Sequence, residues 1–250
     1  MTSASQTTAP KNVTVTGGGS GIGLAIAKVF ADRGHNVTVM GRDRAKLKAT
    51  GLTFFEADVT DDESLTSAIK NAAPADIFIA NAGAAATAPA LKTTRAIWDH
   101  MLAVNLTSAY ISAREAIPPM VNKSWGRFIV IASTASLKAY SYTGAYTAAK
   151  HGVLGWVKTL GLELATSGVT ANAICPGFTD TPLIADAVDN IVAKTGRSRD
   201  EAQKAFTKDN PMGRLITTDE VAGAVMWLCS DIAASINGQA ITIDGGETAS

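Results

Sequence analysis

The sequence predicts an α/β fold: a single doubly wound domain with a seven-stranded parallel sheet and helices on both faces. From Asn12 onward, short β-branched or aliphatic runs alternate with longer helical patterns, as is typical of βαβ units. The composition, 46% hydrophobic and 18% charged, provides enough apolar side chain for a large core. A length of 250 residues suits one such unit. We therefore expect one domain over residues 12–250, preceded by a polar, flexible tail over residues 1–11.

Seven runs have the length and apolar character of buried strands in a parallel sheet. In chain order they are residues 13–16, 36–40, 53–56, 77–80, 127–131, 170–174 and 240–243. Helical periodicity between these runs predicts helices, and glycines close several of them. The predicted helices are residues 22–33, 62–71, 97–120, 147–167 and 219–229. Thr60, followed three residues later by Glu63, has the pattern of a capping box before the second helix.

The segment 180–214 differs from the rest because it is polar and lies between the last two predicted strands. A sheet protein can place a movable cover at this point. We expect the segment to be helical in part and to form a short substrate lid. It carries basic residues that either meet a phosphate of the substrate or form a solvated helix face, namely Lys194, Arg197, Arg199, Lys204 and Lys208.

Charge and composition argue against several classes of protein. Lys and Arg total 22, as do Asp and Glu, so no basic surface predicts binding to nucleic acid or to an anionic membrane. No uncharged apolar run reaches the roughly 18 residues of a membrane span. Cys175 and Cys229 are far apart in the sequence and have no paired spacing, so no disulfide is expected. We expect both to be buried thiols of a cytoplasmic protein. His35, His100 and His151 lack ligand-like spacing, so no metal site is expected.

A glycine-rich turn follows the first predicted strand and opens the first predicted helix. In such a turn, backbone N–H groups and the positive helix end bind a pyrophosphate, and a Cβ at the closest positions would block the phosphates. The spacing Gly-x3-Gly-x-Gly differs from the common dinucleotide fingerprint, and the Gly-Lys-Ser/Thr ending of a triphosphate loop is missing. We predict a Rossmann-type dinucleotide site that includes Gly17, Gly19, Ser20, Gly21, Ile22 and Gly23.

The residues after the second strand bear on the cofactor subtype. An acidic residue at this strand end would hydrogen-bond the ribose 2′-hydroxyl of NAD(H), but Gly41 stands there. Arg42 follows, with a guanidinium that can bind a 2′-phosphate bidentately. NADP(H) is therefore favoured, and NAD(H) stays open because Asp43 comes next.

Tyr146 and Lys150 stand four residues apart in a predicted helix, which places both side chains on one face. An ammonium close to a phenol favours the phenolate and lowers the tyrosine pKa from its usual value of about 10. A lowered pKa suits a general acid or base. Ser133 and the run Asn81-Ala82-Gly83 each follow a buried strand, and Asn105 lies in a helix between them. We expect all of these residues where the carboxyl ends of the strands gather.

Over residues 12–246 the chain resembles the short-chain dehydrogenase/reductase family. The motifs that carry the resemblance occur in order: residues 16–23, Asp58-Val59, Asn81-Ala82-Gly83, Asn105, Ser133, Tyr146-x3-Lys150, and Pro176-Gly177 with Thr181. The resemblance implies a nicotinamide-dependent oxidoreductase that interconverts a ketone and a secondary alcohol. It also implies a homotetramer.

The resemblance assigns a role to each matching residue. Tyr146 would transfer the proton, and Ser133 would hold the carbonyl oxygen. Lys150 would hydrogen-bond the nicotinamide ribose and lower the pKa of Tyr146, while Asn105 would fix a water that passes the proton outward. Besides Tyr146 and Lys150, the implied cofactor contacts are Asp58 at the adenine, then Val59, Asn81, Ala82, Gly83, Pro176, Gly177 and Thr179, and Thr181 at the carboxamide.

Residues 145–152 and 173–177 are similar to 3-hydroxybutyrate dehydrogenases of this family. Those enzymes bind the substrate carboxylate with polar and basic residues at positions where this chain has Ala84, Ala85, Ala86 and Thr143. An apolar mouth favours a 3-oxoacyl thioester or an alicyclic or aryl ketone.

Three alternatives stay open. The first is an NAD-dependent 3-hydroxy acid dehydrogenase. The second is a family member that epimerises or dehydrates sugars, although such enzymes usually have a longer substrate region. The third is a cofactor-binding sensor or subunit without turnover, which would need none of Ser133, Tyr146 and Lys150.

Overall fold

The computed structural model describes residues 9–249, so most of the predicted tail, residues 1–8, lies outside the described residues. The strands are β1 (Asn12–Thr16), β2 (Asn36–Gly41), β3 (Thr53–Glu56), β4 (Ile77–Ala80), β5 (Gly126–Ile131), β6 (Val169–Pro176) and β7 (Ala240–Ile243). They form one sheet in the order β3-β2-β1-β4-β5-β6-β7, and every pairing is parallel. The predicted seven-stranded parallel sheet is confirmed.

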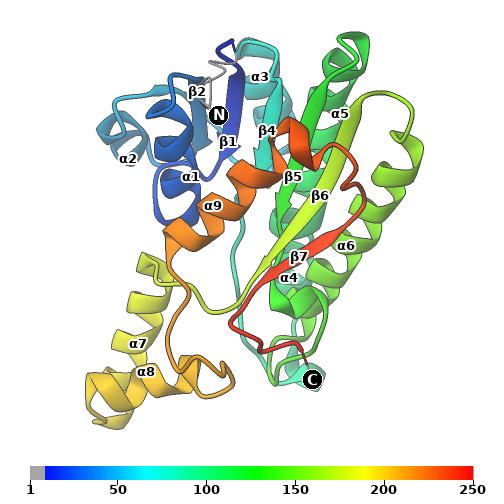
Figure 1. Cartoon of the computed structure of the whole chain (residues 1–250). Coiled ribbons are helices and arrows are strands. Elements are labelled where there is room, and N and C mark those ends of the chain that lie inside the picture. The colour runs from blue at the N-terminus through cyan, green and yellow to red at the C-terminus, as the bar shows by residue number, and fades with distance from the viewer. Residues whose placement is uncertain (1–8, 250) are drawn as a thin grey trace, which may run out of the picture.

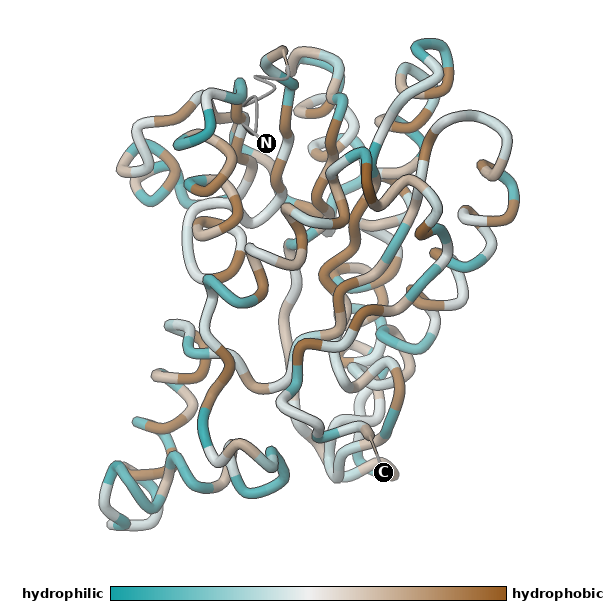
Figure 2. The backbone as a smooth tube through the Cα atoms, in the orientation of Figure 1, coloured by the Kyte–Doolittle hydropathy of each residue, from teal (hydrophilic) through white to brown (hydrophobic). Residues whose placement is uncertain are grey.

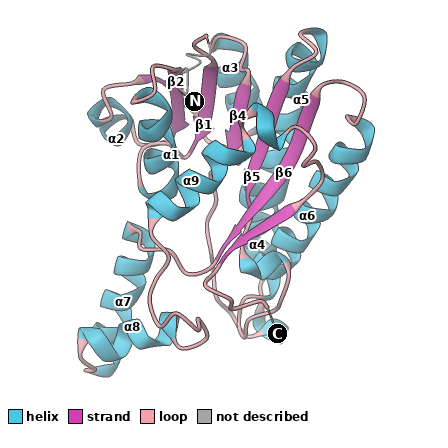
Figure 3. Ribbon diagram, viewed as in Figure 1, coloured by secondary structure: helices cyan, strands magenta, loops and turns pink. Residues whose placement is uncertain are grey.

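Helices cover both faces of the sheet (Figures 1 and 3). On one face lie α1 (Gly21–Ala31), α2 (Arg44–Ala49) and α9 (Thr218–Leu228); on the other lie α3 (Asp62–Asn71), α5 (Ser108–Asn122) and α6 (Gly144–Glu163), with α4 (Arg95–Leu102) packed against α6. The doubly wound arrangement is therefore as predicted. The six-residue α2 was not predicted, because one and a half turns are too short to show helical periodicity.

The strands in the middle of the sheet are buried on both faces, which explains why they read as continuous apolar runs. Every residue of β5 and β6 is buried. Figure 2 shows the hydrophobic segments concentrated in the strands and on the inner sides of the helices. Two large clusters, one on each face, hold the helices against the sheet.

The helix predicted over residues 97–120 is interrupted. It consists of α4, a π-helical segment (Ala103–Thr107) and α5. Asn105 lies in the wide turn, and its side-chain Nδ2 donates to the carbonyl oxygen of Met101 at 3.1 Å and to that of Ala84 at 2.9 Å. The wider turn therefore accommodates a buried amide that also holds the loop after β4, and π-helical turns are frequent at functional sites.

The predicted capping box at Thr60 is wrong. The N-cap of α3 is Asp61, whose carboxylate accepts hydrogen bonds from the backbone N–H groups of Glu63 and Ser64, both at 3.0 Å. The Thr60 hydroxyl instead donates to Asp58 at 2.7 Å. Asp is as good an N-cap as Thr or better, and here the Thr60 hydroxyl is already hydrogen-bonded to Asp58.

The segment predicted as a lid contains α7 (Pro182–Thr195) and α8 (Arg199–Thr207). In Figure 1 the two helices stand beyond the carboxyl ends of β6 and β7, apart from the layers that cover the sheet. The partly helical character predicted for this segment is confirmed. Among the helices of residues 9–249, none combines the length and the apolar character that crossing a bilayer requires.

Candidate active site

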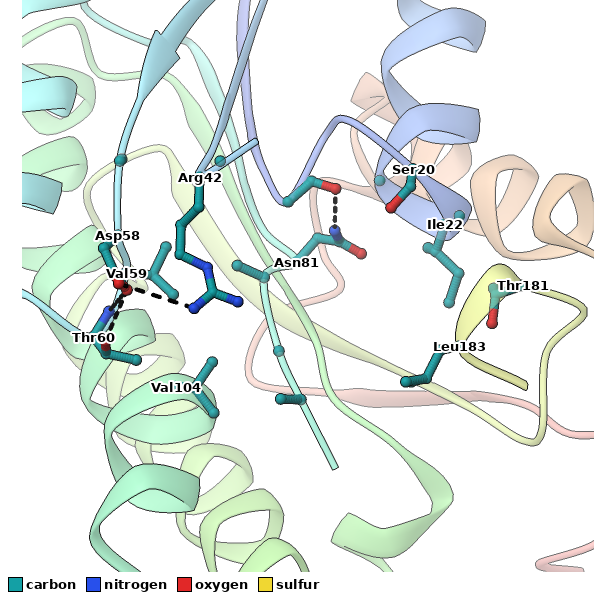
Figure 4. A pocket seen from close by; sticks show the side chains of 18 of the residues that line it. Ser20, Ile22, Arg42, Asp58, Val59, Thr60, Asn81, Val104, Thr181 and Leu183 are labelled. Atoms are coloured by element: carbon teal, nitrogen blue, oxygen red, sulfur yellow. Dashed lines mark hydrogen bonds and ion pairs between the residues drawn. The ribbon is translucent and has the colours of Figure 1, made fainter. Parts of the chain in front are cut away.

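A groove of about 300 Å³ runs along the carboxyl ends of β1, β2 and β4 (Figure 4). It lies where the strand order reverses between β1 and β4, the point at which open α/β sheets bind ligands. The lining comes from four regions: Gly17, Ser20, Gly21, Ile22 and Gly23; Gly41 and Arg42; Ala57, Asp58, Val59 and Thr60; and Asn81, Ala82, Gly83 and Ala84. His100, Val104, Thr181, Pro182 and Leu183 complete it.

Two glycines, one in the turn after β1 and one in the first turn of α1, are required by close contacts. Gly17 has φ +67°, and a Cβ there would lie 2.8 Å from Asn81 Nδ2. A Cβ on Gly23 would lie 2.4 Å from both that nitrogen and the carbonyl oxygen of Gly17. Because Asn81 Nδ2 also donates to the carbonyl oxygen of Thr16 at 2.9 Å, the turn is held tightly against the end of β4. The shape of the groove at this end therefore depends on glycine, which has no side chain, at positions 17 and 23.

The N-terminus of α1 faces the same groove through Ser20, Gly21 and Ile22. The Ser20 side chain, at the N-cap, makes no capping hydrogen bond to the first turn of this helix. The first amides of the helix are therefore available to an anion, and the helix dipole favours negative charge there. The turn, the glycine contacts and the helix end fit the pyrophosphate of a dinucleotide.

The far end of the groove carries opposed charges. Arg42 Nη1 lies 4.0 Å from Asp58 Oδ2, and the Arg42 side chain is 72% exposed (Figure 4). The hydroxyl and backbone N–H of Thr60 donate to Asp58 and lower the pKa of its carboxyl, with a smaller contribution from Arg42. Asp58 is thus ionised at neutral pH and held in place, while the exposed guanidinium can turn toward an anionic ligand.

Gly83, which forms the floor of the groove, lies close to Asn105 and Lys150. A Cβ on Gly83 would lie 2.9 Å from Asn105 Oδ1 and 3.8 Å from Lys150 Nζ. Asn105 is buried, and its Oδ1 accepts from the backbone N–H of Ala84 at 3.4 Å. The amide of Asn105 thereby fixes the backbone that separates the groove from Lys150.

Tyr146 and Lys150 lie in α6, and Ser133 lies at the end of β5. Tyr146, Ala82 and Ala84 pack against one apolar cluster that includes Val104 and Ala145, and Lys150 Nζ lies 5.8 Å from the centre of the Tyr146 ring. The predicted gathering of these side chains at the strand ends is therefore seen.

The electrostatics of the pair differ from the prediction. Burial raises the pKa of Tyr146, and a side-chain hydrogen bond with Ser133 only partly opposes this effect. Lys150 Nζ donates to the carbonyl oxygen of Ile131 at 2.9 Å, and burial lowers the pKa of Lys150 to about 8. The lowered tyrosine pKa expected from the sequence is thus not found in this structure, because desolvation of the phenolate outweighs the hydrogen bond with Ser133, and the Lys150 ammonium does not offset it. Tyr146 is held protonated at neutral pH, as a proton donor would be.

We predict that buried Lys150 makes stability rise with pH. The unfolded chain binds this proton up to about pH 10.5 and the folded chain only to about pH 8, so the unfolded state holds more protons between these values. Wild type should gain about 1 kcal/mol of unfolding free energy from pH 7 to pH 9 relative to Lys150→Met. Urea unfolding at both pH values measures the difference. Equal pH dependence in the two proteins would contradict the prediction.

Most of the predicted cofactor contacts line the groove, but six residues do not. A Cβ on Gly19 would face Lys46, and Pro176, Gly177 and Thr179 are not part of the lining; the Thr179 hydroxyl donates to the carbonyl oxygen of Gly177 at 3.0 Å. Tyr146 and Lys150 are also not lining residues, although Lys150 Nζ would lie 3.8 Å from a Cβ on Gly83. Of the predicted contacts after β6, Thr181 alone lines the groove.

Several lining residues were not predicted. Pro182 and Leu183 directly follow Thr181, and Thr60 had been assigned to a helix cap. His100 and Val104 stand four apart, so both lie on one helix face just before Asn105, a spacing that could have identified them. In residues 9–249, no three His, Cys, Asp or Glu side chains are grouped as metal ligands. Both cysteines are buried, as predicted.

Comparisons with known proteins decide the family. A family model described as enoyl-(acyl carrier protein) reductase matches residues 17–248. D-beta-hydroxybutyrate dehydrogenase of Rhizobium meliloti is 36% identical over 96% of this chain and 99% of its own length. A solved oxidoreductase of the short-chain dehydrogenase/reductase family from Burkholderia thailandensis has a TM-score of 0.85 and 32% identity, over 97% of this chain and 94% of that one. This chain belongs to the short-chain dehydrogenase/reductase family.

Membership of the short-chain dehydrogenase/reductase family confirms the predicted enzyme class. The chain is an oxidoreductase that interconverts ketones and alcohols with NAD(H) or NADP(H). A ketoreductase solved with NADPH, a variant of actinorhodin polyketide ketoreductase, has a TM-score of 0.87 and 30% identity, over 96% of this chain and 97% of that one. The glycine turn and the α1 terminus described above fit the pyrophosphate that such a cofactor carries.

Proposed function

We propose that the enzyme reduces an uncharged, largely apolar ketone with NADPH, and that Tyr146 donates the proton. The observation that carries the proposal is the packing of Tyr146 beside Ser133 and Lys150 at the strand ends, directly behind the groove floor at Gly83. Within residues 9–249 no carboxylate pairs with the buried Lys150, an arrangement more typical of active sites than of stabilising ion pairs.

The side chains would divide the work as follows. When bound, the cofactor supplies the hydride. Ser133 donates a hydrogen bond to the carbonyl oxygen, where negative charge develops, and Tyr146 delivers a proton to the same oxygen. Lys150, with a pKa lowered to about 8, carries positive charge at neutral pH and stabilises the phenolate left after transfer. Asn105 supports this arrangement by holding the backbone at Ala84.

The cofactor would lie along the groove with its pyrophosphate on the glycine turn. The proposed contacts are Gly17, Gly19, Ser20, Gly21, Ile22 and Gly23 for the pyrophosphate, Arg42, Asp58 and Val59 for the adenosine, Asn81, Ala82 and Gly83 along the middle, and Tyr146, Lys150, Pro176, Gly177, Thr179 and Thr181 around the nicotinamide. The exposed Arg42 supports NADPH over NADH, and the NADPH-bound ketoreductase supports the same preference.

Arg42→Ala should weaken NADPH binding at least about tenfold, because a hydrogen bond to a charged group contributes about 1.5–3 kcal/mol. NADH binding should stay within about twofold, since NADH has no 2′-phosphate. Fluorescence titration with both cofactors measures the change, and Arg33→Ala, at the other end of α1, is the control. An equal loss for both cofactors would contradict the role of Arg42.

The surroundings of the site support an apolar substrate. Large hydrophobic side chains are exposed in the segments that follow β4, β5 and β6, namely Leu91, Leu137, Tyr142, Leu183 and Met212. Ala84 and Ala86 pack against the same apolar cluster as Tyr146 and offer no charge to a substrate carboxylate. We propose a 3-oxoacyl thioester or an alicyclic or aryl ketone, with residues 180–214 as its cover.

A thioester of coenzyme A would bring phosphates to the cover. Arg197 and Lys204 flank Glu201 on α8, whereas Arg199 pairs with Asp189 of α7. Replacing Arg197 and Lys204 with alanine should raise KM for a 3-oxoacyl-coenzyme A several-fold and leave KM for a small ketone unchanged. Steady-state kinetics with both substrates measure the split, and equal effects would exclude phosphate contacts at these two residues.

One alternative has specific support. The hydroxybutyrate dehydrogenase relative favours an NAD-dependent 3-hydroxy acid dehydrogenase. Against it stand Arg42 and the missing carboxylate-binding side chains at Ala84, Ala85 and Ala86. A cofactor-binding protein without turnover is disfavoured because cofactor binding alone does not need the hydrogen bond that pairs Ser133 with Tyr146.

The test is binding of NADPH and NADH, followed by absorbance at the nicotinamide band with ketones, 3-oxoacyl thioesters and 3-hydroxybutyrate. NADPH-dependent reduction of an apolar ketone or thioester is the expected result. Oxidation of 3-hydroxybutyrate with NAD would replace the proposal with the hydroxy acid dehydrogenase. Cofactor binding without turnover of any panel member would support the sensor.

The organisation of the protein completes the proposal. We propose one catalytic domain over residues 12–250, assembled as a homotetramer in the cytoplasm, with no nucleic-acid or membrane partner. The balance of 22 basic and 22 acidic residues supports the absence of a nucleic-acid or membrane partner. The exposed Tyr110 on α5 and Leu162 on α6 support an interface between subunits.

A further inference from the structure

The C-terminal tail after β7 places one carboxylate in the interior. The side chain of Glu247 is only 1% exposed, and its Oε2 would lie 3.3 Å from a Cβ on Gly177. Figure 1 shows the tail leaving β7 and running below the carboxyl ends of the strands, where the loops around the site gather. Burying a carboxylate costs folding free energy unless its oxygens accept hydrogen bonds. The groups that donate to Glu247 therefore identify the segments that it holds in place.

Those partners lie on the loop that follows Ser133. The hydroxyl of Tyr140 donates to Glu247, and Lys138 Nζ lies 3.2 Å from the same carboxylate oxygen. The hydroxyl oxygen of Thr134 lies 2.6 Å from that of Tyr140. Since Tyr140 donates to the carboxylate, Thr134 donates to Tyr140. A directed chain of hydrogen bonds therefore starts at the neighbour of Ser133 and ends on the tail.

The ring of Tyr140 is also anchored. It packs edge-on against Phe178 at 5.8 Å between ring centres, and Phe178 packs in the same way against Phe206 of α8 at 5.3 Å. Desolvation and the carboxylate raise the pKa of Tyr140 well above its usual range, so this hydroxyl stays a donor. Tyr140 thus connects the Ser133 loop, the tail, the loop after β6 and the proposed cover.

We propose that Glu247 is a positioning residue of the active site, which acts through Tyr140 and Thr134 to fix Ser133 for the carbonyl oxygen. The inference rests on the role proposed for Ser133. It differs from a purely structural role because only the chemical step should depend on the alignment of Ser133, while cofactor binding at the glycine turn should not. Small displacements of such a group are costly, since about 1 Å can change a rate about 10²-fold.

The experiment compares Glu247→Ala, Glu247→Gln and Tyr140→Phe in the full-length enzyme, with Glu163→Ala at the exposed end of α6 as the matched control. Glu247→Ala and Tyr140→Phe should lower kcat for a ketone about tenfold, with the Kd of NADPH unchanged. Glu247→Gln keeps an acceptor for Tyr140 and should restore most of the rate. Tyr140→Phe keeps the aromatic packing, so it tests the chain if Glu247→Ala fails to fold.

The deciding measurement adds Glu247→Ala to Ser133→Ala. If Glu247 acts through Ser133, the second change should cost less than about twofold in the single-turnover rate, since coupled positions are not additive. A full tenfold further loss, or a Glu247→Ala enzyme as fast as wild type, would overturn the inference. A Ser133→Ala enzyme with full turnover would overturn the proposed function itself, so the two failures are distinguishable.

Discussion

Replacing Tyr146 with phenylalanine should lower kcat for ketone reduction about 10²–10⁴-fold, the usual contribution of a positioned general acid. The phenyl ring keeps the packing of this side chain against the apolar cluster that includes Val104 and Ala145, so packing should change little. Only the proton and the hydrogen bond with Ser133 are lost. Absorbance of NADPH under single-turnover conditions measures the effect.

The controls for this variant separate chemistry from binding. Fluorescence titration of Tyr146→Phe should give an NADPH Kd close to that of wild type, because the glycine turn and Arg42 are untouched. Tyr110→Phe, a half-exposed tyrosine on α5, should retain full activity. If Tyr146→Phe reduced the ketone at the wild-type rate, Tyr146 would not be the proton donor.

Gly23→Ala should cost about 1–3 kcal/mol of unfolding free energy, the usual penalty of overpacking. The added methyl would lie 2.4 Å from the carbonyl oxygen of Gly17 and from Asn81 Nδ2, two groups that the sheet holds in place. If the turn moves to relieve the contact, its amides leave the pyrophosphate position. NADPH and NADH should then both bind at least about 30-fold more weakly, which corresponds to about 2 kcal/mol.

Urea unfolding and cofactor titration measure the two effects of Gly23→Ala. Gly223→Ala is the matched control, because Gly223 lies exposed within α9 and its Cβ would meet nothing within 4 Å. The control should be neutral or more stable, since alanine favours helix by about 1 kcal/mol over glycine. Unchanged cofactor binding in Gly23→Ala would show that the turn does not hold the pyrophosphate.

Local pattern determined most of the fold. Each strand predicted from a buried apolar run was found within two residues of its bounds at either end, because strands covered on both faces cannot carry polar residues at regular positions. The parallel arrangement followed from the helices between strands, since parallel neighbours need such crossovers. The one missed α-helix before β3, α2, has six residues, too few for a period to be recognised.

The sequence also identified the two ends of the site. The glycine spacing and the residue after β2 indicated a dinucleotide, because both depend on residue types that follow a strand directly. The pairing of Tyr146 with Lys150 depended on helical spacing alone. The roles of Ser133 and Asn105 came from the family resemblance and could not be obtained from spacing.

Contacts between distant segments were decided only in the tertiary structure. Burial, which is a property of the packed chain, raised the pKa of Tyr146 where spacing had predicted a lower value. In the π-helical turn, Asn105 bonds to Ala84, 21 residues away in the chain, a contact that no local pattern predicts. The chain of hydrogen bonds from Thr134 to Glu247 spans more than 100 residues, and no periodicity links such positions. Local patterns fix elements because their causes lie within a few residues, whereas desolvation and long-range hydrogen bonds depend on which elements pack together.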